Sequence, residues 1–155
     1  MSNKQKLLIK ASKYCAYRER CQHEVRVKLK ELGASNTVAE GIIAELELNG
    51  FINEERFSRM FAGGKFRQKK WGKRKIIKEL EVRKISSHCI VLGLQEIDQG
   101  NYLETLRGII GKKQEALKAN GASNVTKKVA EFCVRKGYEP EEVWSLLRCN
   151  KNDTK

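Results

Sequence analysis

Apolar residues recur along this chain at spacings of three and four, which place each set on one face of an α-helix. No stretch of four to eight residues alternates cleanly between apolar and polar positions, as a half-buried strand does. The pattern predicts an all-α protein, with one or two unrecognised strands as the alternative. The apolar sets are Leu7, Ala11 and Tyr14; Val25, Leu29 and Leu32; Ile42, Ile43 and Leu46; Phe57, Met60 and Phe61; and Ile76, Ile77 and Leu80.

Glycines and helix-capping residues divide this pattern at short intervals. Glycine enters the left-handed backbone conformation at little cost and therefore often ends a helix. We expect such stops at Gly33, Gly50, Gly100, Gly121 and Gly137. Start signals follow them, because hydroxyl and amide side chains cap helix N-termini and proline suits the first turn. These signals are Ser35 or Asn36, Asn53, Ser86 with Ser87, and Pro140.

The spacing also repeats over a longer distance, and turn positions recur together with apolar ones. Residues 25, 29, 33 and 35 match residues 51 positions later, and the first three match again 104 positions later. Chance matches between helices are the alternative, although agreement at the turns favours a repeat. We expect an elongated tandem array of three three-helix repeats over residues 1–50, 51–100 and 101–155, the third degenerate with a short polar tail. The matched sets are Val25, Leu29, Gly33 and Ser35; Ile76, Leu80, Lys84 and Ser86; and Val129, Cys133 and Gly137.

Positive charge is concentrated in the middle of the chain. The formal net charge is +13, and residues 65–84 hold ten Lys or Arg against two Glu, a local charge of +8. Such density indicates an anionic partner, most commonly a phosphate backbone, with binding that weakens as salt rises. The alternative is that these charges lie on a solvated helix face that binds no partner. The candidate binding residues are Lys65, Arg67, Lys69, Lys70, Trp71, Lys73, Arg74, Lys75 and Lys78.

Two aromatic residues lie inside this basic stretch. Trp71 offers a ring on which an unpaired base could stack, or it covers the joint between two helices. Phe66 is expected to pack inside its own repeat. The pair Gly63 and Gly64 interrupts a helical pattern, which indicates a bend or a close approach of another helix.

Signals for catalysis, metal binding and membrane insertion are weak. A phosphate-binding loop fails at Gly72-Lys73-Arg74, where Ser or Thr should follow the lysine, and His23-Glu24 lacks the second histidine of a zinc-protease helix. No cysteine pair has metal-site spacing. No run approaches the roughly 18 apolar residues of a membrane span, and the N-terminus does not read as a secretory signal. We expect a cytoplasmic protein without catalytic residues, metal or cofactor, whose cysteines are small buried hydrophobes.

Three ordered motifs resemble the RecX family over about residues 5–100. Residues 51–61, FINEERFSRMF, are similar to the opening of that family's central repeat. Residues 70–80, KWGKRKIIKEL, resemble its following helix, and residues 14–21, YCAYRERC, resemble its first repeat. Cys21 departs from the Ser or Thr often found there. Over residues 101–155 only periodicity and helix stops support the resemblance.

The resemblance implies a tandem three-helix fold and a non-enzymatic regulator of the RecA recombinase, active in homologous recombination, DNA repair and the SOS response. Members bind the RecA–single-stranded DNA filament along its groove, limit its growth, and suppress ATP hydrolysis and strand exchange. Some also bind DNA directly, so double-stranded DNA is a further candidate partner, and we expect a monomer. The alternatives are a general DNA- or RNA-binding helical protein acting without RecA, and a helical scaffold that docks to an acidic protein. A small enzyme is the outside case.

Overall fold

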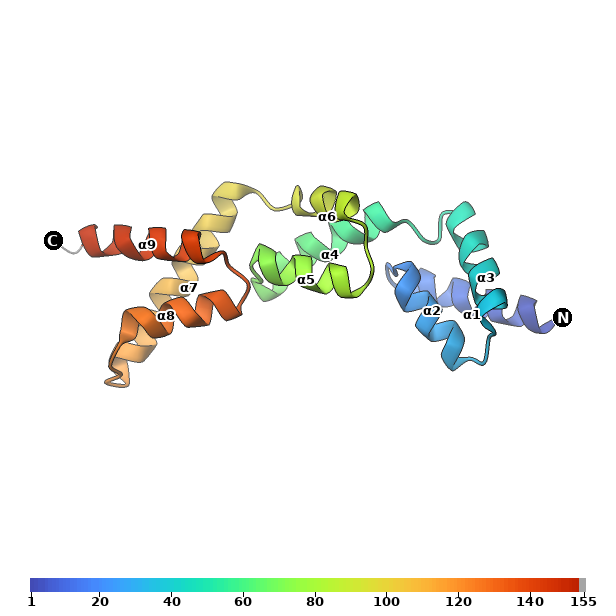
Figure 1. Ribbon diagram of the computed structural model, residues 1–155, viewed down its shortest axis with the longest axis horizontal. Helices are drawn as coiled ribbons and strands as arrows, with labels where there is room; N and C mark the ends of the chain where they lie inside the picture. The colour runs from blue at the N-terminus through green and yellow to red at the C-terminus, as the bar shows by residue number, and fades with distance from the viewer. Residues whose placement is uncertain (154–155) are drawn as a thin grey trace. The chain divides into compact units, whose positions relative to one another are not determined.

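The computed structural model describes residues 1–153 and contains nine α-helices and no strand over that range (Figure 1). The prediction of an all-α protein is confirmed. The last two residues of the expected polar tail lie outside the described residues. The helices are α1 (Asn3–Tyr17), α2 (Gln22–Glu31), α3 (Asn36–Leu48), α4 (Glu54–Lys69), α5 (Lys73–Val82), α6 (Ser87–Leu94), α7 (Gln99–Ala119), α8 (Val125–Arg135) and α9 (Pro140–Asp153).

Equivalent positions of the repeat have equivalent roles in the fold. Val25, Ile76 and Val129 are each 0% exposed, and so are the residues four positions later, Leu29, Leu80 and Cys133. The stop that follows has a positive φ in all three copies: +89° at Gly33, +59° at Lys84 and +107° at Gly137. The helical repeat is therefore confirmed by burial and by backbone conformation. The boundaries at residues 50 and 100 stay a prediction.

Most of the helix starts and stops lie where the sequence places them. Ser35 Oγ accepts a hydrogen bond from Val38 N, and Ser86 Oγ accepts one from Cys89 N, both at 3.2 Å. Asn53 Oδ1 accepts from Arg56 N at 2.9 Å, and Pro140 is the first residue of α9. The expected stop at Gly100 is wrong. Asp98 caps α7 through Asn101 N at 2.9 Å, so Gly100 lies in the first turn of that helix.

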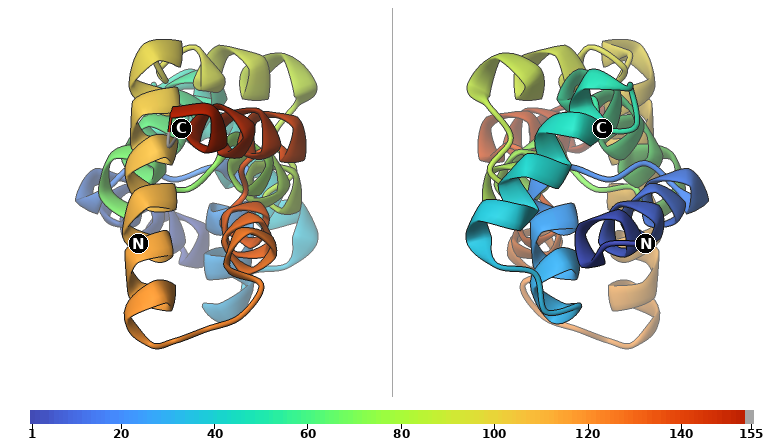
Figure 2. Two further views of the ribbon diagram at one scale, coloured as in Figure 1. Left: turned by 90° about the vertical axis from the view of Figure 1, so that its left-hand side faces the viewer. Right: turned by 90° about the vertical axis from the view of Figure 1, so that its right-hand side faces the viewer.

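The chain divides into two compact units, and the boundary cuts α4 and α5. The N-terminal unit comprises Met1–Phe61 and Leu80–Gly93, and the C-terminal unit comprises Ala62–Glu79 and Leu94–Lys155. In the first, α1, α2 and α3 enclose a core that includes Leu7, Ala11, Val25, Leu29 and Ile42. In the second, α7 packs against α8, and α9 packs against both (Figures 1 and 2).

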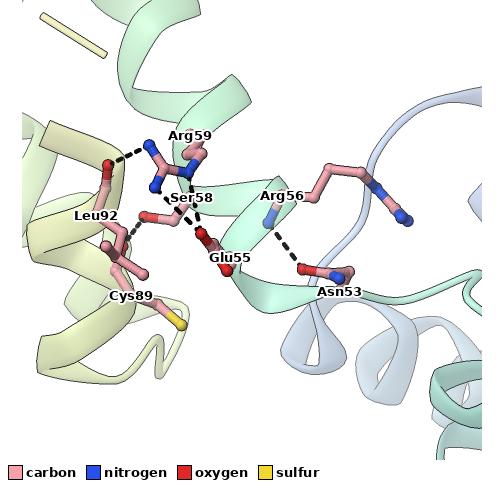
Figure 3. A network of polar contacts seen from close by, with 7 residues as sticks. All are labelled: Asn53, Glu55, Arg56, Ser58, Arg59, Cys89 and Leu92. Atoms are coloured by element: carbon pink, nitrogen blue, oxygen red, sulfur yellow. Dashed lines mark hydrogen bonds and ion pairs between the residues drawn. The ribbon is translucent and has the colours of Figure 1, made fainter. Parts of the chain in front are cut away.

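Within the N-terminal unit, the start of α4 is fastened to α6 (Figure 3). Ser58 Oγ donates to the carbonyl oxygen of Cys89 at 2.7 Å, and Arg59 Nη1 donates to that of Leu92 at 3.1 Å. A Cβ at Gly93 would lie only 2.7 Å from Ser58 O, so the two helices meet at a glycine. The close approach expected at Gly63 and Gly64 is wrong for Gly64, since nothing lies within 4 Å of a Cβ built there, and at Gly63 the nearest atoms belong to Arg67 of α4 itself.

The cysteines are all free thiols, and three of them behave as buried hydrophobes. Cys15, Cys21 and Cys133 are buried, whereas Cys89 is half-buried and Cys149 is exposed. Burial raises the pKa of Cys21 to about 12 and that of Cys133 to about 11, so both stay protonated at neutral pH. Over the described part of the chain, no helix combines the length and apolarity that crossing a membrane requires.

Candidate functional site

The nine candidate residues all lie in the C-terminal unit, on the end of α4, the start of α5 and the turn between them. We call this turn, residues 70–72, the basic joint. Helix α4 ends because Lys70 adopts the left-handed conformation with a φ of +57°. Its N–H donates to Phe66 O at 2.9 Å, and Trp71 N donates to Lys65 O at 3.4 Å, which satisfies the last carbonyls of the helix.

The basic joint is held in place by the turn between α8 and α9. Gly72 N donates to Lys136 O, and Arg74 N donates to Gly137 O, both at 2.9 Å. A Cβ at Gly72 would collide with the peptide group of Gly137, so the backbones touch at a point that only glycine allows. The turn between α8 and α9 therefore fixes the backbone conformation of the basic joint, next to which the candidate cations lie.

Two buried tyrosines complete this attachment. Tyr138 OH donates to the carbonyl oxygen of Lys70 at 2.9 Å. Tyr102 OH accepts from Lys73 N at 3.0 Å and donates to Glu139 Oε1. The two rings stack with centroids 5.0 Å apart, and both residues are 0% exposed. Burial raises the pKa of both hydroxyls, and the Glu139 hydrogen bond adds to the rise at Tyr102, so both remain hydrogen-bond donors.

Sequence reasoning missed this attachment. Tyr102 and Tyr138 are isolated aromatic residues in the sequence, and nothing local indicates that each reaches the basic joint. The local sequence Gly137, Tyr138, Glu139 and Pro140 predicts a helix stop and a helix start and carries no further signal of this contact. Phe66, predicted to pack inside its own repeat, is buried at 8% exposed. Its ring centroid lies 5.8 Å from that of Tyr102, a residue beyond the expected repeat boundary at residue 100.

Three of the candidate residues come together around one indole ring. Trp71 is half-buried in the basic joint, with Lys65 Nζ 5.1 Å and Lys75 Nζ 4.5 Å from the ring centroid. Ammonium groups over an aromatic face are attracted by its quadrupole. The cluster therefore places two positive charges beside an aromatic surface that is partly open to solvent.

The side chain of Lys73 makes contacts with α7 within the C-terminal unit. Its Nζ donates to Gln99 Oε1 at 2.9 Å and lies 4.6 Å from the centroid of the Tyr102 ring. Its backbone N–H is the donor to Tyr102 OH described above. The ammonium of Lys73 is thus engaged with α7 inside the unit, and it lies apart from the exposed cations.

The other five candidates are exposed to solvent, and we call them the five exposed cations. Among residues 1–149, the part of the chain whose side chains the structure describes, none of them forms an ion pair with a carboxylate. Two of them, Arg74 and Lys78, lie four residues apart on the same face of α5. This uncompensated charge is available to an anionic partner. The five exposed cations are Arg67, Lys69, Lys70, Arg74 and Lys78.

The motif at residues 51–61 has a structural role in the N-terminal unit. Arg56 Nε donates to Glu19 Oε1 at 2.7 Å, and its Nη2 donates to Gly50 O at 3.0 Å. Phe57 is 4% exposed. The arginine therefore connects the α1–α2 turn to the α3–α4 turn, and the phenylalanine packs in the core, so these two motif residues have structural roles.

Comparison with protein families matches the two segments that carry these motifs. A model described as RecX, first three-helix domain, matches residues 9–46, and one described as RecX, second three-helix domain, matches residues 53–91. The chain belongs to the RecX family. The two RecX models matched here end at residue 91 and include none of α7, α8 and α9, which agrees with the weaker motifs over residues 101–155.

Individual RecX proteins match over more of the chain. The relatives named "Regulatory protein RecX" from Bacillus cereus (strain G9842) and Bacillus anthracis (strain CDC 684 / NRRL 3495) are each 22% identical over 149 residues, 96% of this chain. The chain spans about half the length of these curated relatives, 55% in both cases.

Solved RecX structures share the fold. The crystal structure of RecX from Lactobacillus salivarius has a TM-score of 0.82 at 18% identity and covers 94% of both chains. A crystal structure of regulatory protein RecX has a TM-score of 0.84 at 16% identity, covering 94% of this chain and 71% of the other. The fold of the third segment is therefore shared with RecX although its sequence has diverged.

Proposed function

We propose that this RecX-family chain is a negative, non-enzymatic regulator of the RecA recombinase. It binds the RecA–single-stranded DNA filament in its groove and limits filament growth, ATP hydrolysis and strand exchange. It acts as a cytoplasmic monomer without a cofactor in homologous recombination, DNA repair and the SOS response. The observation that carries the proposal is the set of five exposed cations, which lie in the basic joint and on the two helices beside it, where the turn between α8 and α9 fixes the backbone.

The fixed backbone supports binding for an energetic reason. A flexible basic loop loses conformational entropy when it binds, whereas a joint already hydrogen-bonded at Lys70, Gly72 and Arg74 loses less. The cations contact DNA phosphates, acidic side chains of the recombinase, or both. Phosphate contacts release condensed counterions, so affinity falls steeply with salt.

The second candidate is a general DNA- or RNA-binding protein that acts without RecA. The observation that favours it is the Trp71 cluster with Lys65 and Lys75, because a partly open indole beside two ammonium groups suits a base and its phosphates. This function predicts binding to single-stranded DNA of similar strength with and without the recombinase.

The test is the DNA-dependent ATP hydrolysis of RecA on single-stranded DNA, titrated with this protein. Inhibition well below one copy per recombinase supports a filament regulator. Inhibition only at amounts that coat the DNA supports the second candidate. The key variant changes Lys69, Lys70, Arg74 and Lys78 together to Glu, which reverses four exposed charges without touching the buried contacts.

A matched control reverses the same amount of charge elsewhere. Lys6, Lys10, Lys112 and Lys118 are also exposed, on α1 and α7, and their change to Glu gives an equal net charge. We expect the joint variant to lose inhibition and the control to keep most of it. Equal inhibition by a folded joint variant and the wild type would contradict the role of the five exposed cations.

A further inference from the structure

A second surface feature lies outside the basic joint and is lined by residues of α8 and α9. It is an open groove of about 430 Å³, which we call the α8–α9 groove. The function proposed above does not use it. Its lining residues are Lys127, Ala130, Glu131, Val134, Arg135 and Trp144.

The floor of the groove is apolar. Ala130 is 3% exposed, whereas Val134 is 37% and Trp144 is 39% exposed. Trp144 directly follows Val143, which is 0% exposed and packs in the core, so the indole side chain is carried off the core face of α9. A large aromatic ring left partly open beside a valine marks a place where an apolar side chain can be buried.

The rim of the groove carries charge in a regular order along α8. Lys127, Glu131 and Arg135 are spaced by four residues and share one helix face. Lys127 and Arg135 are eight positions apart and so lie about 12 Å apart along the helix axis, because an α-helix rises 1.5 Å per residue. Two cations thus bracket the apolar floor at a known separation.

We propose that the α8–α9 groove binds an extended acidic segment of a partner protein. In an extended chain, residues one, three and five point to the same side, and four residues span about 13 Å. A segment with acidic residues at positions one and five and an apolar residue at position three therefore matches Lys127, the floor and Arg135. The apolar residue packs against Trp144 and Val134, and the carboxylates pair with the two cations.

Glu131 favours a peptide over a nucleic acid as the occupant. A phosphodiester backbone carries a negative charge at every step and would be repelled by a carboxylate at the centre of the rim. A peptide leaves its central backbone N–H groups free to donate to that carboxylate. The proposal does not depend on the partner being a recombinase.

Trp144 supplies a direct measurement. The chain has two tryptophans, so in a Trp71→Phe background the tryptophan fluorescence comes from Trp144 alone. The full-length variant is titrated with a terminally blocked pentapeptide that has aspartate at positions one and five, leucine at position three and glycine between them. We expect a saturable change in the fluorescence of Trp144, and at least a fivefold weaker response when leucine is replaced by glycine.

Charge variants test the pairing. Lys127→Gln with Arg135→Gln should weaken peptide binding about tenfold, since two partly exposed ion pairs are lost. Lys112→Gln with Lys118→Gln removes equal charge from exposed positions of α7 and should leave binding within twofold. Far-UV circular dichroism confirms that each variant is folded.

Three results would overturn the proposal. One is the absence of a saturable response at millimolar peptide, and another is equal binding of the peptide with lysines in place of aspartates. The third is a stronger Trp144 response to a short oligothymidine than to the peptide, in which case the groove is a base-stacking site. If the protein binds the peptide but does not inhibit RecA, only the proposed function is contradicted. The failure of that function and the failure of the groove proposal are therefore distinguishable.

Discussion

The hydroxyl of Tyr138 donates a hydrogen bond of 2.9 Å to the carbonyl oxygen of Lys70, across a sequence separation of 68 residues. This contact joins the turn before α9 to the turn after α4. Because Lys70 has a positive φ, its backbone needs support from outside the turn. The tyrosine supplies that support, and the charged side chain of Lys70 stays in solvent.

Tyr138→Phe tests this contact. The change keeps the buried ring and removes one donor, so the Lys70 carbonyl loses its partner. We expect the free energy of unfolding to fall by about 1–2 kcal/mol, measured by urea denaturation. Hydrogen exchange of the amides of residues 70–74 should also become faster. Tyr17→Phe is the control, because Tyr17 is 84% exposed, and its effect should be within about 0.5 kcal/mol.

Glycine-to-alanine changes should have opposite effects on stability at Gly64 and Gly72, which are eight residues apart in the chain. At Gly72 the new methyl group collides with the Gly137 peptide, so we expect Gly72→Ala to destabilise the fold by about 1–3 kcal/mol. At Gly64, inside α4, nothing lies within 4 Å of a new Cβ. Gly64→Ala should therefore stabilise by about 1 kcal/mol, because alanine is the better helix former. Thermal unfolding of both variants measures the difference, and effects of the same sign would contradict the backbone contact.

The repeat predicts that the change Lys84→Gly stabilises the fold. The equivalent positions in the other two copies are Gly33 and Gly137, and all three residues have a positive φ. A lysine pays a steric penalty in this conformation that glycine avoids. We expect Lys84→Gly to raise the free energy of unfolding by about 0.5–1 kcal/mol. Lys78→Gly, in the middle of α5, should lower it by about 1 kcal/mol and serves as the comparison.

Glu54 should make stability depend on pH. Burial raises the pKa of its carboxyl above the ordinary value of 4.5, the Glu47 carboxylate adds to the rise, and its Oε2 is buried without a hydrogen-bond partner. The unfolded chain releases this proton near pH 4.5, whereas the folded chain holds it to a higher pH. The favourable contribution is therefore complete below pH 4.5 and is lost as the pH rises through the folded pKa.

Glu54→Gln removes that dependence. The free energy of unfolding of the variant, relative to the wild type, should increase between pH 4 and pH 7 in urea denaturation series. Glu81→Gln, at an exposed position of α5, measures the effect of removing a surface charge alone. A difference between Glu54→Gln and the wild type that is constant over this range would exclude the raised pKa.

Local pattern was sufficient for the helices and the repeat, because burial at spacings of three and four and the left-handed stops are encoded within each segment. Val25, Ile76 and Val129 illustrate this, since each is buried for the same local reason. Local pattern predicted a helix stop at Gly100 wrongly, because the Asp98 cap outweighs the effect of a glycine in the first turn. The prediction of a close helix approach also failed at Gly64, because such an approach depends on which element lies opposite.

The candidate surface was predictable only in part. Charge density identified the stretch from residue 65 to residue 78, yet it could not separate Lys73, engaged with Gln99 and Tyr102, from an exposed residue such as Arg74. It also could not reveal Tyr138 and Gly137 as supports. Those contacts depend on the tertiary fold, which brings together turns that are far apart in sequence.

The two ends of α7 differ in their relation to the basic joint, which is attached at Gly72 and Tyr138. Tyr102, near the start of this 21-residue helix, takes part in the attachment, whereas its far end leads into the turn at Gly121 and Asn124, both of positive φ. Insertions accumulate where backbone is exposed and few tertiary bonds are made. The α7–α8 turn is therefore the natural place to attach a fluorophore or an affinity tag, since added length there leaves the geometry around Lys70 unchanged.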